Sequence, residues 1–173
     1  MKVLAISGSL RASSSNAILL RVLPLVAPEL ELTFAPPLDF LPFFDADVEE
    51  AGLPDPVARW RGSIRDHAAL VICSPEYAHG VSGLLKNALD WLVGGIEIVE
   101  KPVAVINTSL PSTAAHASLI EILGAMGGRV VPEASIAVQL RGRRLDERDM
   151  AFDASISRLL HGAMTALSAA AKP

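Results

Sequence analysis

The chain has 173 residues, of which 51% are hydrophobic and 20% charged, with a formal net charge of −4 at pH 7. These values fit one globular domain over residues 1–173, and the acidic balance argues against a nucleic-acid partner bound by a basic face. Because Cys73 is the only cysteine, intramolecular disulfides and cysteine-rich zinc sites are excluded. Charged residues interrupt both apolar-rich segments and no secretory signal is visible, so we expect no membrane segment and a cytoplasmic location.

Short apolar runs alternate with longer helical patterns along the chain. We expect strands at residues 2–6, 31–35, 69–73, 102–107 and 130–131 with 134–138, and helices at residues 15–26, 57–67, 83–92, 113–126 and 146–170. Between the second strand and the second helix we expect a long loop at 36–56. The strands are continuous apolar runs, which is typical of a parallel sheet covered on both faces. The pattern predicts an α/β fold, a flavodoxin-like three-layer doubly wound sandwich with the five-stranded order 2-1-3-4-5.

The turn after the first strand is rich in hydroxyl groups and carries one guanidinium. A loop of small residues before a helix is a ready anion site, because free N–H groups and the positive helix end point at one place. The turn has one glycine, Gly8, and no lysine after it, so it is neither a dinucleotide fingerprint nor a Walker A loop. We expect a monophosphate there, bound by Ser9, Arg11, Ser14, Ser15 and Asn16. The alternative is that Ser13, Ser14 and Asn16 only cap the helix.

The loop after the third strand lies beside this turn in the expected topology, at the switch point where such sheets bind ligands. Pro75 makes the exit from the strand rigid, and Gly80 and Gly83 let the backbone approach a flat ligand with free N–H groups. The candidates in this loop are Pro75, Glu76, Tyr77, Ala78, His79 and Gly80. An ordinary half-buried loop pair is the alternative for Tyr77 and His79.

The loop after the fourth strand reaches the same edge, and its hydroxyl groups, Ser109 among them, could close over a ring. Capping by Ser112 or Thr113 is the alternative there, and we expect His116 on the helix surface. The four histidines have no metal-ligand spacing, and no serine lies in a hydrolase arrangement, so no metal and no catalytic acid or base is predicted.

Two segments resemble motifs of the NADPH-dependent FMN reductase family. Gly8-Ser9-Leu10-Arg11 with Ser14 and Asn16 resembles its phosphate loop, and Ser74-Pro75-Glu76-Tyr77, followed by Gly83 and Leu85-Lys86-Asn87-Ala88, resembles a second motif. The resemblance implies a flavodoxin-like fold, bound FMN, NADPH or NADH as the electron donor, and a homodimer or homotetramer. It also implies that Ser9, Arg11, Ser14 and Asn16 bind the phosphate while Pro75, Glu76 and Tyr77 lie along the isoalloxazine.

The second segment departs from the family pattern at four positions. Ala78 replaces the usual Asn, His79 stands where Tyr is frequent, Gly80 where Ser is, and Ser82 replaces a Pro.

The expected function is transfer of a hydride from the nicotinamide to flavin and on to a small-molecule acceptor: a quinone, an azo compound, a metal oxyanion or free flavin. The alternatives are a non-enzymatic electron carrier, a flavin-binding regulatory domain and a hydrolase of the same fold.

Overall fold

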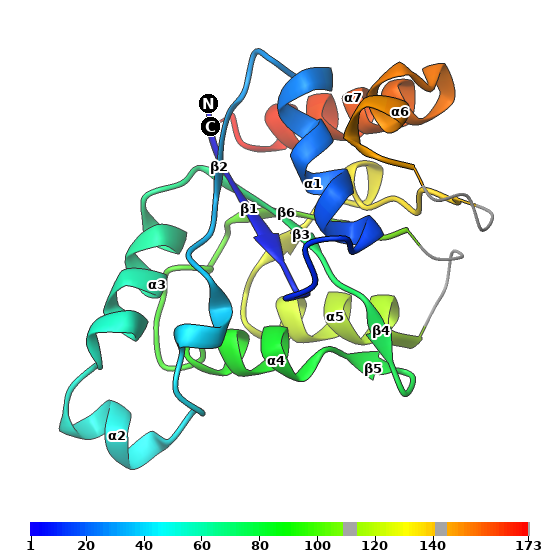
Figure 1. Ribbon diagram of the computed structural model, residues 1–173. Helices are drawn as coiled ribbons and strands as arrows, with labels where there is room; N and C mark the ends of the chain where they lie inside the picture. The colour runs from blue at the N-terminus through cyan, green and yellow to red at the C-terminus, as the bar shows by residue number, and fades with distance from the viewer. Residues whose placement is uncertain (109–113, 141–144, 173) are drawn as a thin grey trace.

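The computed structural model describes residues 1–108, 114–140 and 145–172. A five-stranded parallel sheet of order β2-β1-β3-β6-β7 forms its centre, and helices cover both faces (Figure 1). The strands are β1 (Lys2–Ser7), β2 (Glu31–Phe34), β3 (Ala69–Cys73), β6 (Pro102–Ile106) and β7 (Arg129–Val130), and a separate hairpin joins β4 (Glu76–Tyr77) to β5 (Gly80–Val81). The predicted flavodoxin-like sandwich is confirmed, because the five sheet strands take the predicted spatial order when counted along the chain.

Seven α-helices are present in the described part of the chain. They are α1 (Ser15–Val26), α2 (Ala46–Ala51), α3 (Asp55–Arg65), α4 (Gly83–Asp90), α5 (Ala114–Ala125), α6 (Glu147–Phe152) and α7 (Ala154–Ala170). Helices α1, α6 and α7 pack on one face of the sheet, and α3, α4 and α5 pack on the other. Among the described residues, no helix is long and apolar enough to span a membrane.

The inner strands are buried on both faces, and this explains their continuous apolar sequence. In β1, Val3 and Ala5 belong to the core beneath α1 and α7, whereas Leu4 and Ile6 belong to the core beneath α3 and α4. The second core also holds Trp60, whose indole N–H donates to the Ala88 carbonyl oxygen at 2.8 Å and joins α3 to α4. Both helical layers are therefore fixed to the sheet whose edge carries the polar loops.

Four expectations about elements were wrong. The predicted loop 36–56 contains α2, which projects from the body, and a short 3₁₀ helix (Leu38–Phe40). The last predicted strand is only β7, followed by a 3₁₀ turn (Pro132–Ala134) and an isolated bridge to Ala137. The predicted loop after β3 forms the β4–β5 hairpin. The predicted final helix is divided into α6 and α7, because the Asp153 carboxylate caps α7 by accepting from Ser155 N and Ile156 N.

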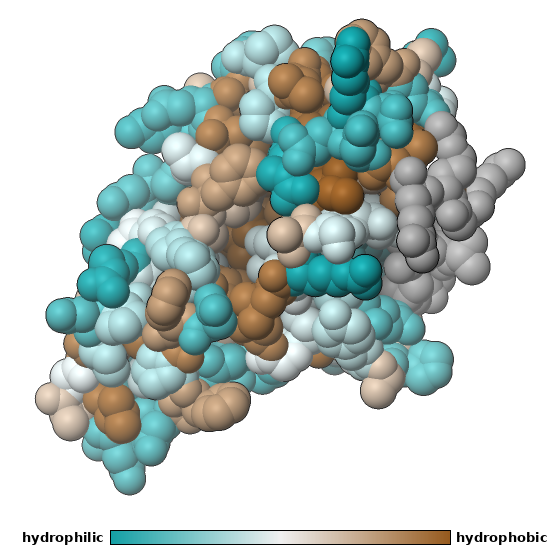
Figure 2. Space-filling model, in the orientation of Figure 1, coloured by the Kyte–Doolittle hydropathy of each residue, from teal (hydrophilic) through white to brown (hydrophobic). Residues whose placement is uncertain are grey.

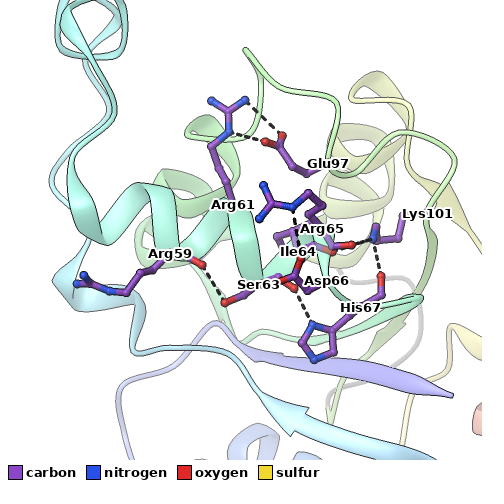
Figure 3. A network of polar contacts seen from close by, with 9 residues as sticks. All are labelled: Arg59, Arg61, Ser63, Ile64, Arg65, Asp66, His67, Glu97 and Lys101. Carbon is purple, nitrogen blue, oxygen red and sulfur yellow. Dashed lines mark hydrogen bonds and ion pairs between the residues drawn. The ribbon is translucent and has the colours of Figure 1, made fainter.

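Ion pairs hold the projecting α2 against the rest of the molecule. Arg61 on α3 donates to Glu49 on α2 at 3.0 Å and to Glu97 at 2.8 Å. Burial by itself would raise the pKa of Glu97, but the hydrogen bond and charge of Arg61 outweigh it, so the pKa is lowered. At the C-terminal end of α3, Lys101 donates to the carbonyl oxygens of Ile64 and His67, where the helix dipole favours a cation (Figure 3).

Candidate functional site

A cavity of about 710 Å³ opens at the carboxyl edge of the sheet. Four chain segments line it: the β1–α1 loop with the start of α1, the exit from β3, the second residue after β6, and the approach to α6. Its lining residues are Ser9, Arg11, Ser13, Ser14, Ser15, Asn16, Ile18, Pro75, Glu76, Tyr77, Thr108, Leu145 and Asp146. All five candidates of the first loop and the first three of the second loop therefore face one space.

The β1–α1 loop presents hydrogen-bond donors that have no protein acceptor. Ser14 is the N-cap residue of α1, yet its side chain makes no capping hydrogen bond. Within the described residues, the hydroxyl groups of Ser14 and Ser15 make no hydrogen bond, and the N–H groups of the first turn of α1 have no backbone acceptor. The capping alternative is therefore wrong, and hydroxyl and N–H donors gather at the positive end of a 12-residue helix.

Arg11 is oriented within the same loop. Its Nε donates to the Ser13 hydroxyl at 2.9 Å, while its backbone N–H donates to the Ser9 hydroxyl at 3.3 Å. The two terminal guanidinium nitrogens make no hydrogen bond to any residue that the structure describes. They remain available for a bidentate contact with an anionic oxygen pair.

Asn16 is a buried junction between three elements as well as a lining residue. Its Oδ1 accepts from Thr108 N and Thr108 Oγ1, each at 3.1 Å, and from Cys73 Sγ at 3.2 Å. Three donors on one oxygen assign the amide orientation, so Nδ2 is the polar side-chain atom left for the cavity. Among the described residues, nothing accepts a hydrogen bond from Nδ2.

Gly8 is required by the close approach of two loops. A Cβ at this position would lie 2.8 Å from the Cβ of Ser74, at the exit from β3. The Gly8 N–H donates to the Cys73 carbonyl oxygen at 2.8 Å, and Ser82 Oγ donates to the Gly8 carbonyl oxygen at 2.7 Å. The two candidate loops are thereby fixed side by side, as the switch-point prediction requires.

The second loop is divided between the cavity and the tip of a hairpin. Pro75, Glu76 and Tyr77 line the cavity, and Tyr77 remains 61% exposed. Ala78 and His79 form the two-residue turn of the hairpin with φ values of 50° and 60°. Neither these two residues nor Gly80, which lies in β5, is among the residues that line the cavity.

The Glu76 carboxylate is directed toward α5 and the hairpin tip. Its Oε2 accepts from the Ala115 N–H at 3.0 Å, and its Oε1 lies 3.3 Å from His79 Nδ1. The His79 side chain is 89% exposed. Glu76 therefore joins the exit from β3 to the start of α5, and both of its carboxylate oxygens have protein partners.

The third loop is only partly described. Ser109, Ser112 and Thr113 lie outside the described residues. His116, which we expected on the helix surface, is half-buried and accepts from Asn107 Nδ2 at 3.1 Å. Burial lowers its pKa, because the low-dielectric surroundings disfavour the imidazolium.

Five lining residues are not among the candidates from the sequence. The sequence offers Ser13 only as a helix cap. Ile18 lies in the first predicted helix, and Thr108 directly follows the fourth predicted strand. Leu145 and Asp146 lie more than 120 residues beyond the first loop in the chain, and only the packing of α6 brings them to the cavity. The Asp146 carboxylate accepts from Asp149 N at 2.7 Å as the N-cap of α6.

The site is suited to an anion at one end and a flat group at the other. Hydroxyl, amide, guanidinium and helix N–H donors gather at the start of α1, and Pro75 and Tyr77 line the cavity from the exit of β3. No three His, Cys, Asp or Glu side chains of the described residues are grouped so that they could bind a metal ion. The cavity volume lies within the range of small-molecule and cofactor sites, roughly 300–1,000 Å³.

Comparisons with known proteins agree with this arrangement. Residues 1–141 match the family model of NADPH-dependent FMN reductases. A quinone reductase of Escherichia coli K12 is 38% identical over 114 residues, which cover 64% of this chain and 61% of that protein. An NAD(P)H-dependent FMN reductase of Pseudomonas aeruginosa is 39% identical over 112 residues, covering 63% and 60%. The chain thus aligns with only about 60% of the length of these relatives.

A solved structure extends the likeness of the fold to nearly the whole chain. The flavoenzyme NAD(P)H:(acceptor) oxidoreductase of Paracoccus denitrificans superposes with a TM-score of 0.74, covering 96% of this chain and 95% of that one. The sequences are 24% identical. At this identity the superposition supports the flavodoxin-like fold alone.

Proposed function

The chain belongs to the NADPH-dependent FMN reductase family, and on this basis we propose that it is an FMN-dependent oxidoreductase that uses NADPH or NADH as the electron donor. The observation that carries the proposal is the gathering of unpaired donors at the α1 end of the cavity. FMN, when bound, supplies the redox chemistry by accepting a hydride from the nicotinamide and delivering it to an acceptor.

The α1 end of the cavity fits the phosphate of FMN. Hydroxyl groups of Ser9, Ser14 and Ser15, the terminal nitrogens of Arg11 and the Asn16 amide would bind the phosphate oxygens. Both carboxylates that line the cavity already have protein partners. Glu76 accepts from a backbone N–H of α5, and Asp146 accepts from a backbone N–H of α6. Both carboxylates keep their charge, but the dipoles of the N–H groups that donate to them offset part of their repulsion of an anion.

The ring of FMN would lie toward the exit from β3. Pro75 and Tyr77 offer a rigid wall, and backbone N–H groups of the hairpin would bind the polar edge of the ring and stabilise negative charge that develops there. Ala78, His79 and Gly80 would neighbour the ring through their backbone and not through their side chains. Ser109 would close over the ring from the third loop.

We propose a quinone as the acceptor. The support is the likeness to the Escherichia coli protein named quinone reductase. Azo compounds, metal oxyanions and free flavin are the other acceptors to compare. The chain supplies no predicted acid–base residue, so its part in catalysis is to position the reactants and exclude water.

We also propose that residues 1–173 form one domain that assembles as a homodimer or homotetramer. Helices α6 and α7 complete the core on the face that α1 covers, which favours one cooperative unit. Phe43, Val93 and Ile96 are 90%, 64% and 83% exposed on the lobe around α2, and exposed apolar patches mark interaction surfaces. Figure 2 shows hydrophobic side chains at the surface of this lobe, at lower left.

The test measures cofactor binding before activity. The purified protein should be yellow or become so with FMN, show a thermal shift with FMN, and oxidise NADPH faster when benzoquinone is added. Arg11→Ala should weaken FMN binding at least tenfold, whereas Arg59→Ala, on α3 away from the cavity, should not. A colourless protein with no thermal shift in FMN would reject the proposal.

A further inference from the structure

The segment that leads into α6 forms part of the cavity although it lies beyond the region that matches the family model. That match ends at residue 141, whereas Leu145 and Asp146 line the cavity and Glu147 begins α6. Figure 1 shows α6 packed beside α1, on the same face of the sheet. This segment can therefore influence the site through contacts that the family motifs do not include.

Arg21, two helical turns into α1, joins this segment to the phosphate loop. Its Nη2 donates to the Ala12 carbonyl oxygen at 3.2 Å, and its Nε donates to Glu147 Oε1 at 2.5 Å. Ala12 lies between Arg11 and Ser13, which both line the cavity. One guanidinium thus fixes the middle of the loop and is itself oriented by the carboxylate on α6.

Helix α6, which begins at Glu147, is anchored to the core. Asp146 and Asp149 form a reciprocal capping box at the start of α6, and Met150 is fully buried in the core shared with α1 and α7. The position of Glu147 is thus set by packing rather than by its own exposed side chain, and it can serve as a fixed anchor for Arg21.

We propose that Arg21 is a positioning residue for the cofactor phosphate, and that Glu147 acts on FMN affinity only through it. By holding the Ala12 carbonyl oxygen, Arg21 keeps the loop in the shape that directs the donors of Arg11 and Ser13–Ser15 into the cavity. This inference rests on the proposed function, because it assumes that the phosphate of FMN is bound by this loop.

The direction in which Glu147→Gln changes FMN affinity distinguishes a positioning role from a purely electrostatic one. Glu147 is a negative charge near a site for an anion, so removal of its Coulomb repulsion predicts that Glu147→Gln tightens FMN binding. Positioning predicts the opposite, because the substitution releases Arg21 and loosens the loop. Since the pair is partly exposed, at 36% and 47%, the expected loss of affinity is about two- to fivefold.

The experiment compares dissociation constants of FMN and riboflavin, measured by quenching of flavin fluorescence. Glu147→Gln, Arg21→Met and the double variant should each weaken FMN binding, and the double variant should be no weaker than Arg21→Met. Riboflavin lacks the phosphate, so its affinity should stay constant. Arg148→Gln is the matched control, since Arg148 lies over the Phe152 ring on the same helix and should leave FMN affinity unchanged.

A second variant guards against a general effect of charge. Glu147→Asp keeps the charge but shortens the side chain, so positioning predicts weakened FMN binding and electrostatics predicts wild-type affinity. Unchanged or tighter FMN binding in Glu147→Gln overturns the inference, as does an effect of that substitution that persists in the Arg21→Met background. If the wild-type protein binds no FMN at all, the proposed function fails instead.

Discussion

At the scale of single residues, the site depends on side chains that join elements as well as face the cavity. Asn16 is the clearest case, because its Oδ1 accepts from the ends of two neighbouring strands through Cys73 and Thr108. The same contacts leave its Nδ2 for the cavity. Burial raises the pKa of the Cys73 thiol, so the sulfur remains a protonated donor to Asn16 rather than a reactive thiolate.

Asn16→Asp should separate these two roles. The aspartate has the same shape, and Oδ1 can still accept all three donors, so we expect the free energy of unfolding to fall by no more than about 1 kcal/mol. Its second oxygen would face the phosphate, and repulsion should weaken FMN binding more than tenfold. Fluorescence titration and urea denaturation measure the two quantities.

Asn16→Ala is the comparison for that variant. It leaves the buried donors of Cys73 and Thr108 without an acceptor, so it should cost about 1–3 kcal/mol of stability. Equal FMN affinity in Asn16→Asp and the wild type would contradict a role for Nδ2 at the phosphate.

His116 should make stability depend on pH in the mildly acidic range. Its pKa is lowered in the folded state by burial, so below the unfolded value of 6.5 the unfolded chain binds the proton more readily. Stability should therefore fall as the pH is lowered through 6.5, by at most about 1.4 kcal/mol per pH unit from this group. Urea denaturation between pH 5 and 7.5 measures the slope.

His116→Gln should flatten that slope, because glutamine does not titrate. His161→Gln is the control, since His161 is exposed on α7 and bonded to the Val26 carbonyl oxygen. A slope that stays the same in His116→Gln would show that other groups produce the pH dependence.

At the scale of elements, the β4–β5 hairpin carries local strain beside the cavity. Its two turn residues, Ala78 and His79, both have positive φ, a region that costs L-residues with a Cβ about 1–2 kcal/mol. Two-residue turns of this kind favour Asn and Gly, and the family pattern indeed has Asn at the first position. The replacement by Ala is thus a departure that the hairpin accommodates at a cost in stability.

Ala78→Asn should stabilise the protein by about 0.5–1 kcal/mol, because Asn tolerates the left-handed region better than Ala. Differential scanning calorimetry of the apo protein measures the change in Tm. Ala58→Asn, at an exposed position within α3, is the matched control and should destabilise the protein, since Asn is a poorer helix former than Ala. A lower Tm for Ala78→Asn would argue against relief of strain at the turn.

At the scale of the whole molecule, one edge of the sheet carries the cavity and a separate lobe carries the exposed apolar residues. The lobe is held to the body by Arg61 between Glu49 and Glu97, and by Phe44, whose ring meets that of Trp91 edge-on at 5.1 Å. The apolar side chains of Phe43 and Ile96 are therefore presented on a fixed frame. This arrangement is what a contact between subunits requires.

Ile96→Asp should reduce the assembly to monomers, since a buried unpaired carboxylate in an apolar contact costs several kcal/mol. Light scattering after size-exclusion chromatography measures the mass of the wild type and the variant. Phe152→Asp is the control, because Phe152 is 78% exposed on α6, outside the lobe. A wild type that is monomeric at micromolar concentration would reject the proposed assembly.

Much of the fold and half of the site could be predicted from local sequence patterns. Continuous apolar strands separated by helical segments determine a parallel sheet, because only burial on both faces accommodates them. The strand order and the placement of Ser9–Asn16 beside Pro75–Tyr77 then follow from right-handed crossovers and the switch point. Gly8 also belongs here, since its missing side chain is needed where the two loops meet.

The rest was decided only by tertiary packing. The residues of α2 do not indicate where this helix packs, and it is held against the body by the ion pair between Glu49 and Arg61. Ala78 and His79 form the tip of a hairpin rather than the lining of the cavity because β4 pairs with β5, a pairing too short to be recognised in sequence. Leu145 and Asp146 reach the cavity, and Glu147 reaches Arg21 on α1, only because Met150 anchors α6 beside α1. Sequence by itself thus determined which chemistry the loops can carry, whereas packing decided which distant residues support it.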